Sequence, residues 1–524
     1  MKSIFEKIPK FEWRTGWAGV WGAAATFAGR LLGLASSVAI ASSFGAKSDT
    51  DMFYFALGAL ALASSLITCV FSSTFIPLYI KLRTEAGDKE SSSFAGMVLL
   101  VSFIAGSVFS LGVAIFHKPF LRVASGFGAD VISESGYLFE GVVLFLVPLL
   151  ALEFGAALLS AGRHFLLPAL HPLISSMALL FSVLILSDGL RSDALLIGIW
   201  SGGLLNCICL LGACVFHGRL GMPRSSSVSR GIDLARISAP IMGAQVFSFA
   251  YLYLMRYLAS RLEEGTVTAL NYAETLAAAP VLGLAMPLAN AIYPKLCEFK
   301  AKNDMSGLRD FYVMAQRGMA LIIAPAALFC IAFAWPLVHL LYRHGKFSFE
   351  AADNAAFALT LYSLGIAGLS IVALNGRASI SGADSKLVSL GAITSIGGSI
   401  LGVLLQVGLF WHLGMPGIPS GRVIEASLWS GGFGFVFAWM ALGGFDRLRV
   451  ARGIVFHYTV ASLASIPGLL LCNALGRGFS GLLLGTGLFL VLYAAAQFGY
   501  KTPEFKLVLS MLRQGIMFIK DSTS

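Results

Sequence analysis

The feature that most constrains the fold of this chain is a succession of long apolar segments separated by short polar ones. Fourteen of them are of the length that a helix needs to cross a bilayer, about 20 residues. They lie at roughly 17–44, 52–80, 94–116, 138–160, 166–186, 193–216, 237–260, 268–292, 318–341, 352–373, 387–411, 423–442, 454–475 and 480–500. Only 12% of the 524 residues are charged, about half the share in a soluble domain. We therefore predict an all-α polytopic membrane protein with about 14 transmembrane helices.

The 37 Lys and Arg residues predict how these helices are oriented. If both termini are cytoplasmic, 26 of the cations fall on the cytoplasmic side, nine on the other side and two, Arg30 and Arg256, inside the membrane. Cytoplasmic loops carry an excess of Lys and Arg, so this orientation is the one that we predict. It also assigns the net charge of +10 to loops lying against anionic lipid, and a nucleic-acid partner is not expected.

Two stretches far apart in the chain resemble each other and indicate an internal repeat. IASSFGAKSDTDMFYFA (40–56) is similar to LASRLEEGTVTALNYA (258–273), and in both copies a proline (Pro77 or Pro294) follows 21 residues later. The copies start six helices apart, so they keep the same orientation and predict two six-helix lobes related by a parallel repeat. Transporters built from repeats bind substrate near the middle of the membrane, between the repeats.

The repeat and the polar stretches together predict the following division. It consists of a cytoplasmic interfacial segment (1–16), an N-lobe of helices 1–6 (17–216), a cytoplasmic linker (217–236), a C-lobe of helices 7–12 (237–442), helices 13 and 14 (443–500) and a cytoplasmic amphipathic tail (501–524). The linker is the longest polar stretch in the middle of the chain.

A few ionisable residues fall inside the predicted helices. They are Arg30, Asp51, Glu153, Arg256 and Glu274, with Arg377 near the inner end of its helix. A charge near the middle of a bilayer costs several kcal/mol, so such residues face a partner or a water-filled cavity. For Arg30 two alternatives stay open, because it is either half of a structural ion pair or part of a substrate cavity.

The other residues of this set have structural alternatives too. Arg256 could snorkel along its helix toward the membrane surface, and Arg377 could simply follow the positive-inside pattern. Glu153 and Glu274 are either protonated packing residues or carriers of a coupling ion or proton. Asp51 lies near a helix start, where the helix dipole favours a carboxylate.

No motif for catalysis or metal binding accompanies these charges. The eight His residues are scattered, the seven Cys residues lie mostly in apolar runs, and there is no glycine-rich loop for a nucleotide. The sequence therefore predicts a transporter that is not an enzyme, needs no cofactor or metal, and is driven by the membrane potential or an ion gradient.

Three motifs resemble those of one known family. GRLLGLASSVAIASSFGAKSDTDMFYFA (29–56), LASRLEEGTVTALNYAETL (258–276) and LYRHGKFS (341–348) are similar to motifs of the MviN/MurJ family. These are the lipid II flippases of the multidrug/oligosaccharidyl-lipid/polysaccharide exporter superfamily. The resemblance extends over essentially the whole chain and implies a location in the bacterial inner membrane. Asn271, within the second motif, joins the candidate substrate-binding residues.

The chain departs from this family at several cationic positions. Arg30 and Asp51 match family residues, but a family Arg-Asp pair falls on Ser36-Ser37 and paired family arginines fall around Ser64-Ser65. The resemblance assigns to those arginines the grip on the diphosphate of lipid II. It therefore implies a lipid-linked saccharide as substrate without fixing lipid II itself.

The second motif departs from the family as well. Glu274 and Thr275 replace an Asp-Arg pair, and Met255 stands where relatives often carry an acid implicated in sodium binding. Sodium coupling is therefore not expected.

These observations predict a flippase for a polyprenyl-diphosphate-linked saccharide that works by alternating access, with lipid II or a surface-polysaccharide repeat unit as cargo. The candidate substrate-binding residues are Arg30, Asp51, Arg256, Asn271, Glu274 and Arg377, and the coupling candidates are Glu153 and Glu274. The expected partners are the lipid-linked substrate and the phospholipid bilayer, with envelope-synthesis enzymes as further candidates. Two alternatives stay open: a cation-coupled drug exporter of the same superfamily, and a non-transporting scaffold for envelope assembly.

Overall fold

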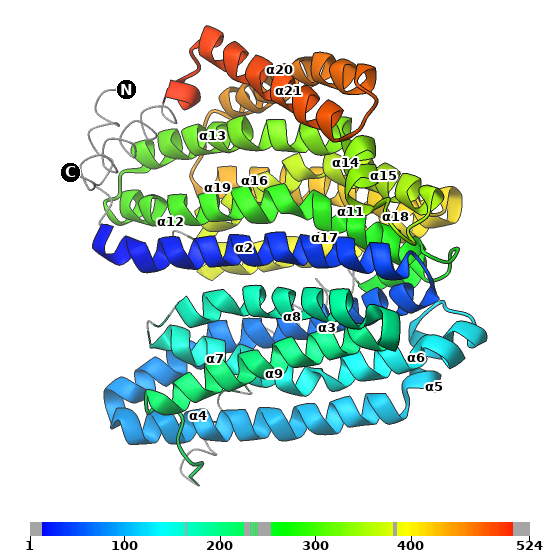
Figure 1. Cartoon of the computed structure of the whole chain (residues 1–524). Helices are drawn as coiled ribbons and strands as arrows, with labels where there is room; N and C mark the ends of the chain where they lie inside the picture. Colours follow the sequence, from blue (N-terminus) through cyan, green and yellow to red (C-terminus); the bar gives the residue numbers. More distant parts are fainter. Residues whose placement is uncertain are drawn as a thin grey trace, which may run out of the picture. The chain divides into compact units, whose positions relative to one another are not determined.

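The computed structural model describes residues 13–162, 164, 166–224, 231, 234, 236, 238, 253–380 and 385–506, with side chains left out before residue 25 and at 379–395. Figure 1 draws this part of the chain in colour. Every regular element within it is a helix, so the predicted all-α polytopic fold is confirmed. The predicted segment at 1–16 and the tail at 501–524 lie largely outside the described residues, as does most of the predicted helix at 237–260.

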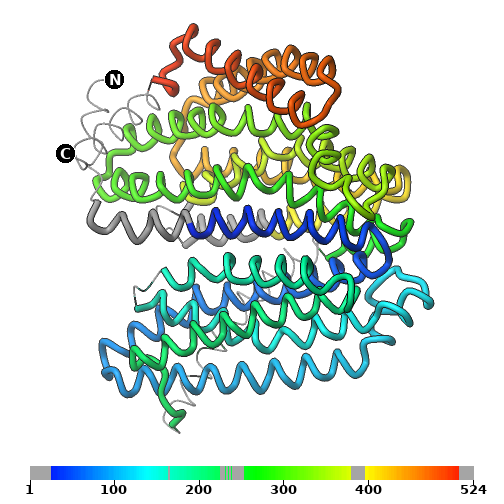
Figure 2. The backbone as a smooth tube through the Cα atoms, viewed as in Figure 1, coloured from blue at the N-terminus to red at the C-terminus, as the bar shows by residue number. Residues whose placement is uncertain are grey.

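The described residues contain 11 helices that are long and apolar enough to cross a membrane, or 12 if the bent pair Phe349–Leu364 and Ile366–Ala378 forms one span. One of them, Ser48–Ile115, has 68 residues, about three times the length that one crossing needs. Its helical backbone is broken at Gly87, where φ is 83° and ψ is 179°. The trace turns back along this segment (Figure 2), which therefore accounts for two predicted helices, 52–80 and 94–116.

The chain divides into two compact units, residues 1–249 and 250–524. The first contains α2 (Trp13–Phe44), α3 (Ser48–Val70), η1 (Phe71–Phe75), α4 (Ile76–Ile115), α5 (His117–Ala124), α6 (Ala129–Leu144), α7 (Leu146–Ala161), α8 (Leu166–Leu190) and α9 (Asp193–Phe216). Helix α8 packs against both α2 and α9, while α7 packs against α4 and α9 (Figure 1). Buried aromatic rings of Phe71, Phe75 and Phe154 hold the centre of this unit together.

The second unit contains the remaining helices. They are α11 (Thr266–Pro280), η3 (Val281–Ala285), α12 (Met286–Ala301), α13 (Met305–Ala332), α14 (Ala334–Tyr342), α15 (Phe349–Leu364), α16 (Ile366–Ile380), α17 (Ser385–Leu413), α18 (Gly417–Ile424), η4 (Glu425–Phe433), α19 (Gly434–Ala441), α20 (Arg447–Ala474) and α21 (Phe479–Tyr500). Helix α11 packs on α15, α18 packs on both α15 and α17, and α20 packs on α13 and α21. The contacts of α11, α15 and α18 bring together the segments that carry the polar cluster described below.

Each unit has a π-helical turn directly ahead of a proline. Pro77 is the second residue of α4, after η1, and Pro287 is the second residue of α12, after η3. Proline has no N–H to donate to the preceding turn, and wider π turns form where the regular bonding pattern is interrupted in this way. The two units thus share a local distortion in corresponding helices, α3–α4 and α11–α12.

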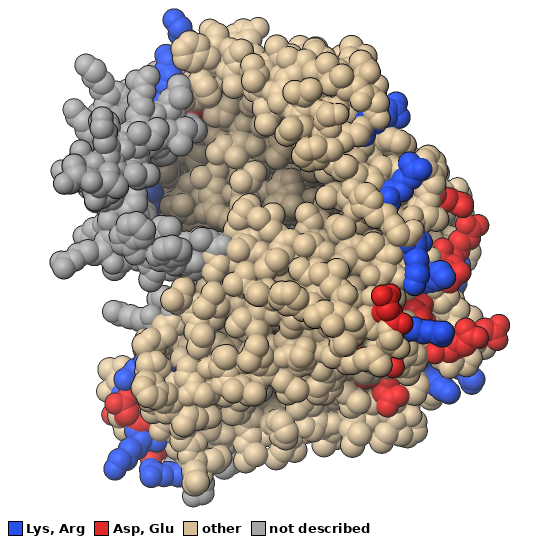
Figure 3. Space-filling model, viewed as in Figure 1, with Lys and Arg blue, Asp and Glu red and all other residues tan. Residues whose placement is uncertain are grey.

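The surface of the chain suits a hydrocarbon environment. On the face that Figure 3 shows, Lys, Arg, Asp and Glu gather near helix ends and are almost absent from the sides of the helices. Large apolar side chains are exposed on helix sides, for example Val108 at 69% and Phe109 at 63% on α4. Apolar surface of this extent is a liability in water, whereas in a bilayer it is the surface that lipid chains cover.

Candidate functional site

Four polar side chains meet in the second unit. Arg256 lies in the helical residues 253–259 ahead of α11, Asn271 and Glu274 lie on α11, and Arg422 lies on α18. Arg422 Nη1 donates to Glu274 Oε1, and Arg256 Nη2 lies 3.9 Å from the other carboxylate oxygen, Oε2. Arg256 Nη2 also donates to Asn271 Oδ1 at 3.5 Å. We call these four residues the Glu274 cluster, in which two guanidinium groups flank one carboxylate.

Local sequence explains part of this arrangement. Asn271 and Glu274 are three residues apart, so both side chains lie on the same face of α11. The helix begins after Gly265, whose φ of 86° is a left-handed conformation that glycine adopts without strain. At this turn the chain passes from the helical stretch that carries Arg256 into α11. Arg256 therefore lies next to the face of α11 that carries Asn271 and Glu274.

The four residues of the Glu274 cluster together carry one net positive charge, because they include two arginines and one carboxylate, and Glu425 is a further carboxylate close enough to Arg422 to interact with it electrostatically. The side chains of Arg256, Glu274 and Arg422 are 15%, 20% and 22% exposed. Arg256 Nε is buried and, in the described part of the chain, has no hydrogen-bond partner. A partly open, net cationic group of arginines with a free donor is suited to bind an anion.

The sequence does not reveal Arg422 as a site residue. It places Arg422 just before the predicted helix 423–442 and therefore among the cations outside the membrane. The structure corrects this position, because the helical run that can span the membrane starts at Gly417 and ends at Ala441. Glu425, in the same run, was missed as well, and it accepts a hydrogen bond from Ser430 within η4. Extending the predicted helix by a single residue toward its N-terminus would have included Arg422.

Arg377 occupies a different environment in the same unit. It lies on α16 and its Nε donates to Asn290 Oδ1 of α12 at 3.0 Å, while its guanidinium lies 5.9 Å from the ring centre of Tyr293. Asn290 and Tyr293 are three residues apart on α12, so they form one face that receives the arginine. Arg377 therefore has its own neutral partners and is held by them near the end of α16.

Glu153 in the first unit is bound by hydroxyl groups. It lies on α7 and accepts hydrogen bonds from Ser64 Oγ at 2.9 Å and Thr68 Oγ1 at 2.8 Å, both on α3. Ser64 and Thr68 are four residues apart, so their hydroxyls lie on the same face of α3. Each carboxylate oxygen thus has a neutral donor, at a place where the family resemblance would put arginines.

Arg30 and Asp51 lie in the first unit, on α2 and α3. Arg30 is exposed on α2 and, among the residues that the structure describes, has neither an ion-pair nor a hydrogen-bond partner. Asp51 is 3% exposed in the first turn of α3, a position that the helix dipole favours for a carboxylate. The structure thus supplies no partner for Arg30 that would make it half of an ion pair in this part of the chain.

The absence of an arginine at position 36 has a packing reason. Ser36 is 2% exposed, and its Oγ donates to the backbone oxygen of Ser176 on α8 at 3.0 Å. A Cβ added at Gly29, two turns earlier on α2, would lie 2.8 Å from Leu173 N. Helices α2 and α8 therefore approach so closely that a guanidinium side chain has no room between them.

The comparisons with known proteins agree with the motifs. The family model described as "Lipid II flippase MurJ" matches residues 40–494. The lipid II flippase MurJ of Burkholderia cenocepacia is 26% identical over 365 residues, 66% of this chain and 69% of that protein. The probable lipid II flippase MurJ of Vibrio cholerae is 23% identical over 429 residues, 78% of this chain and 80% of that protein.

Solved structures show the same fold. A lipid II flippase MurJ in an inward closed conformation is similar over 92% of this chain and 100% of that chain, with a TM-score of 0.76 and 17% identity. An inward-facing multidrug resistance transporter of the MATE family is similar over 80% of this chain and 98% of that chain, with a TM-score of 0.67 and 14% identity. At these identities the likeness concerns the fold alone.

Proposed function

We propose that this chain, which belongs to the MurJ family of lipid II flippases, moves a polyprenyl-diphosphate-linked saccharide across the bacterial inner membrane by alternating access. The observation that carries the proposal is the Glu274 cluster, where Arg256 and Arg422 flank one carboxylate and where Glu274 and Arg422 lie in candidate membrane spans. Arginine pairs with phosphate oxygens through two parallel hydrogen bonds. A diphosphate is therefore the kind of ligand that a surplus guanidinium in this place would select.

The cluster also suggests how binding and release could be balanced. A fixed cation in a low-dielectric region lowers the electrostatic cost of carrying an anionic head group through it. In the empty protein Glu274 pairs with both guanidiniums, so neither is left without a carboxylate beside it. We propose that the diphosphate competes with Glu274 for Arg256 or Arg422, and that protonation of Glu274 would favour the substrate-bound form.

The remaining candidates have supporting roles in this proposal. Arg30 has no partner in the described part of the chain and is available to a phosphate, while Asn271 orients Arg256. Asp51 and Arg377 stay candidate substrate contacts, and Glu153 stays a candidate for coupling to an ion or proton. Of the two possible cargoes, lipid II is the first to test, because the relatives described above are lipid II flippases by name.

The alternative of a cation-coupled drug exporter is not favoured. A site for cationic drugs should be acidic, whereas the Glu274 cluster has one positive charge in excess. A non-transporting scaffold would have no use for a surplus cation inside its helices, which is costly to keep there.

The decisive experiment compares arginine variants in proteoliposomes that contain fluorescent lipid II. We expect Arg422→Ala to abolish flipping and Arg422→Lys to restore only part of it, because an ammonium cannot reproduce the two-pronged contact with phosphate. Arg477→Ala is the matched control, since Arg477 binds Asn473 at the surface and lies outside the cluster. Normal flipping by a folded Arg422→Ala protein would refute the proposed site, and flipping of only a polysaccharide repeat unit would exclude lipid II as cargo.

The proposal also includes the orientation, with both termini in the cytoplasm. Single cysteines at Gly221 and Asn303 should then react with an impermeant thiol reagent only from the cytoplasmic side, and one at Asp188 only from outside. The native cysteines must be replaced first, and labelling of position 221 in intact cells would contradict this topology.

A further inference from the structure

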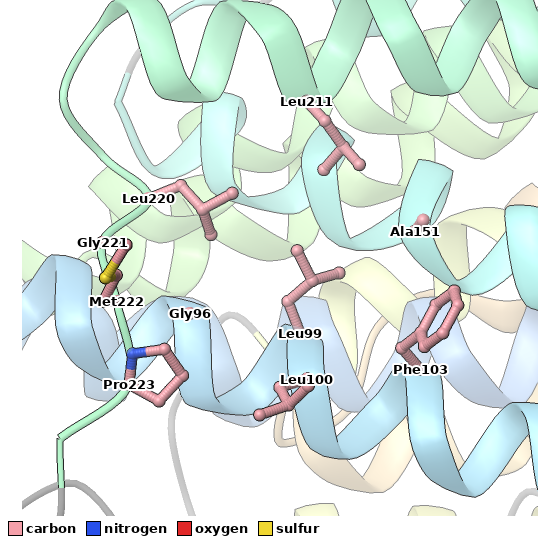
Figure 4. Close-up of a pocket in the computed structure, with 10 residues that line it drawn as sticks. All are labelled: Gly96, Leu99, Leu100, Phe103, Ala151, Leu211, Leu220, Gly221, Met222 and Pro223. Carbon is pink, nitrogen blue, oxygen red and sulfur yellow. The ribbon is translucent and has the colours of Figure 1, made fainter.

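The first unit has an apolar groove that transport of the head group does not use. Its volume is about 530 Å³, within the range of roughly 300–1,000 Å³ that is common for ligand sites. Ten residues of α4, α7, α9 and the segment after α9 line it, and none has a polar side chain. In Figure 4, the side chains of Leu99, Leu211 and Leu220 point into the same space.

The segment after α9 closes one end of the groove by folding onto α4. Gly221 N donates to the backbone oxygen of Ser92 at 3.0 Å. A Cβ added at Gly96 would lie 1.8 Å from Gly221 O, so this approach of two backbones requires glycine at position 96. The contact holds Leu220 and Met222 over the helices, and these side chains form the apolar wall of the groove at that end.

The open side of the groove faces the surroundings of the protein. Leu100 and Phe103 on α4 are 47% and 50% exposed, and Met222 is 89% exposed. The three helices that form the groove all belong to candidate membrane spans. Water has no hydrogen-bonding partners in such a lining, so a hydrocarbon chain is the natural occupant.

Charges at the closed end indicate which kind of lipid fits. Lys89, Ser92, Gly96, Leu99 and Phe103 follow one another at spacings of three and four residues, so they lie on one face of α4. Lys89 is therefore at the polar end of the stripe that lines the groove.

A second cation lies at the same end. Arg224 directly follows the lining residue Pro223. It is 56% exposed, and its Nη1 is 3.6 Å from Glu90 Oε1, a surface pair that holds it only weakly. Two cations and one carboxylate leave this end of the groove positively charged, which attracts anionic head groups. We propose that the groove binds one acyl chain of an anionic glycerophospholipid, with the lipid phosphate at Arg224 and Lys89.

The test uses the full chain in nanodiscs that contain phosphatidylglycerol with a photoreactive diazirine on one acyl chain. After illumination, mass spectrometry should locate the adducts on Leu99, Phe103, Leu211 and Met222. Leu220→Trp fills the groove and should lower the yield of these adducts roughly tenfold, as expected when about two methylene groups are kept out of an apolar site. Val108→Trp, at an exposed position of α4 that does not line the groove, is the matched control and should not change it.

The head-group part of the proposal has its own variant. Arg224→Ala should weaken the preference for phosphatidylglycerol over phosphatidylcholine about fivefold, the effect expected of one cation near a membrane surface, and Arg122→Ala on α5 should leave it unchanged.

If Leu220→Trp fails to fold, Leu99→Trp fills the groove from the α4 side. Adducts spread evenly over lipid-facing residues would overturn the proposal. So would labelling by a polyprenyl phosphate probe that excess phosphatidylglycerol does not displace, or a groove protected by a co-purifying protein.

Discussion

The two units solve the problem of an intramembrane carboxylate in opposite ways. In the first unit, Glu153 is satisfied by two hydroxyls, Ser64 and Thr68, from a neighbouring helix. In the second unit, Glu274 is satisfied by two guanidiniums, Arg256 and Arg422. Among the described residues, Glu153 accepts hydrogen bonds from neutral donors alone, whereas Glu274 has two arginines beside it.

This difference separates two kinds of polar site. Neutral donors match a carboxylate without bringing further charge into the membrane. The two arginines of the second site require an anion between them, because the removal of Glu274 would leave two positive charges side by side. We therefore expect Glu153 to be tolerant of neutral replacement and Glu274 to be intolerant of it.

Glu274→Gln should show the largest effect. The amide cannot compensate two partly buried guanidiniums, and breaking such a pair typically costs about 3 kcal/mol or more of the free energy of unfolding. Thermal unfolding in detergent measures this loss. The double variant Glu274→Gln/Arg422→Gln should recover most of the stability while flipping stays absent, and a fully stable single variant would show that Glu274 does not balance the arginines.

Removal of both hydroxyls around Glu153 should have the next largest effect. In Ser64→Ala/Thr68→Val the carboxylate keeps its position but loses two donors, and a hydrogen bond to a charged group contributes about 1.5–3 kcal/mol. We expect a loss near the lower end of this range for the pair, since Glu153 is not fully buried. Unfolding of Ser65→Ala, which removes a hydroxyl bonded to its own helix, provides the control, and equal stability of both variants would contradict the assigned hydrogen bonds.

Glu153→Gln should change stability by less than about 1 kcal/mol, because an amide oxygen still accepts one hydrogen bond and a hydroxyl can turn to accept from the amide NH₂. The informative measurement is transport against an imposed pH or ion gradient. If Glu153 carries the coupling proton, flipping by this stable variant should no longer respond to the gradient. An unchanged response would leave Glu153 with a packing role.

Arg30→Ala should have the smallest effect on stability, within about 0.5 kcal/mol of the native chain, as is usual for exposed side chains without partners. Its effect on flipping should nevertheless be large if Arg30 contacts the diphosphate. Measuring both on the same preparation distinguishes this role from a structural ion pair, for which poor expression and a lowered melting temperature would be expected. A variant that is stable and flips normally would remove Arg30 from the site.

The sequence by itself determined the membrane fold and most of the intramembrane charges. Hydrophobicity over about 20 residues is a local property, so the helices and the charged residues within them can be read along the chain. The same holds for the motifs at 29–56, 258–276 and 341–348, which indicated the family. None of these conclusions depends on which helix lies next to which.

The tertiary structure alone decided which partner each charge has. Arg422 meets Glu274 across 148 positions of the sequence, and Glu153 meets Ser64 across 89. Hydrogen bonds and ion pairs act over only a few ångströms, so they are set by the packing of α11 and α18 on α15, and of α3 with α7. Position 36 depends on tertiary packing in the same way, since the close approach of α2 and α8 leaves room for serine and none for arginine.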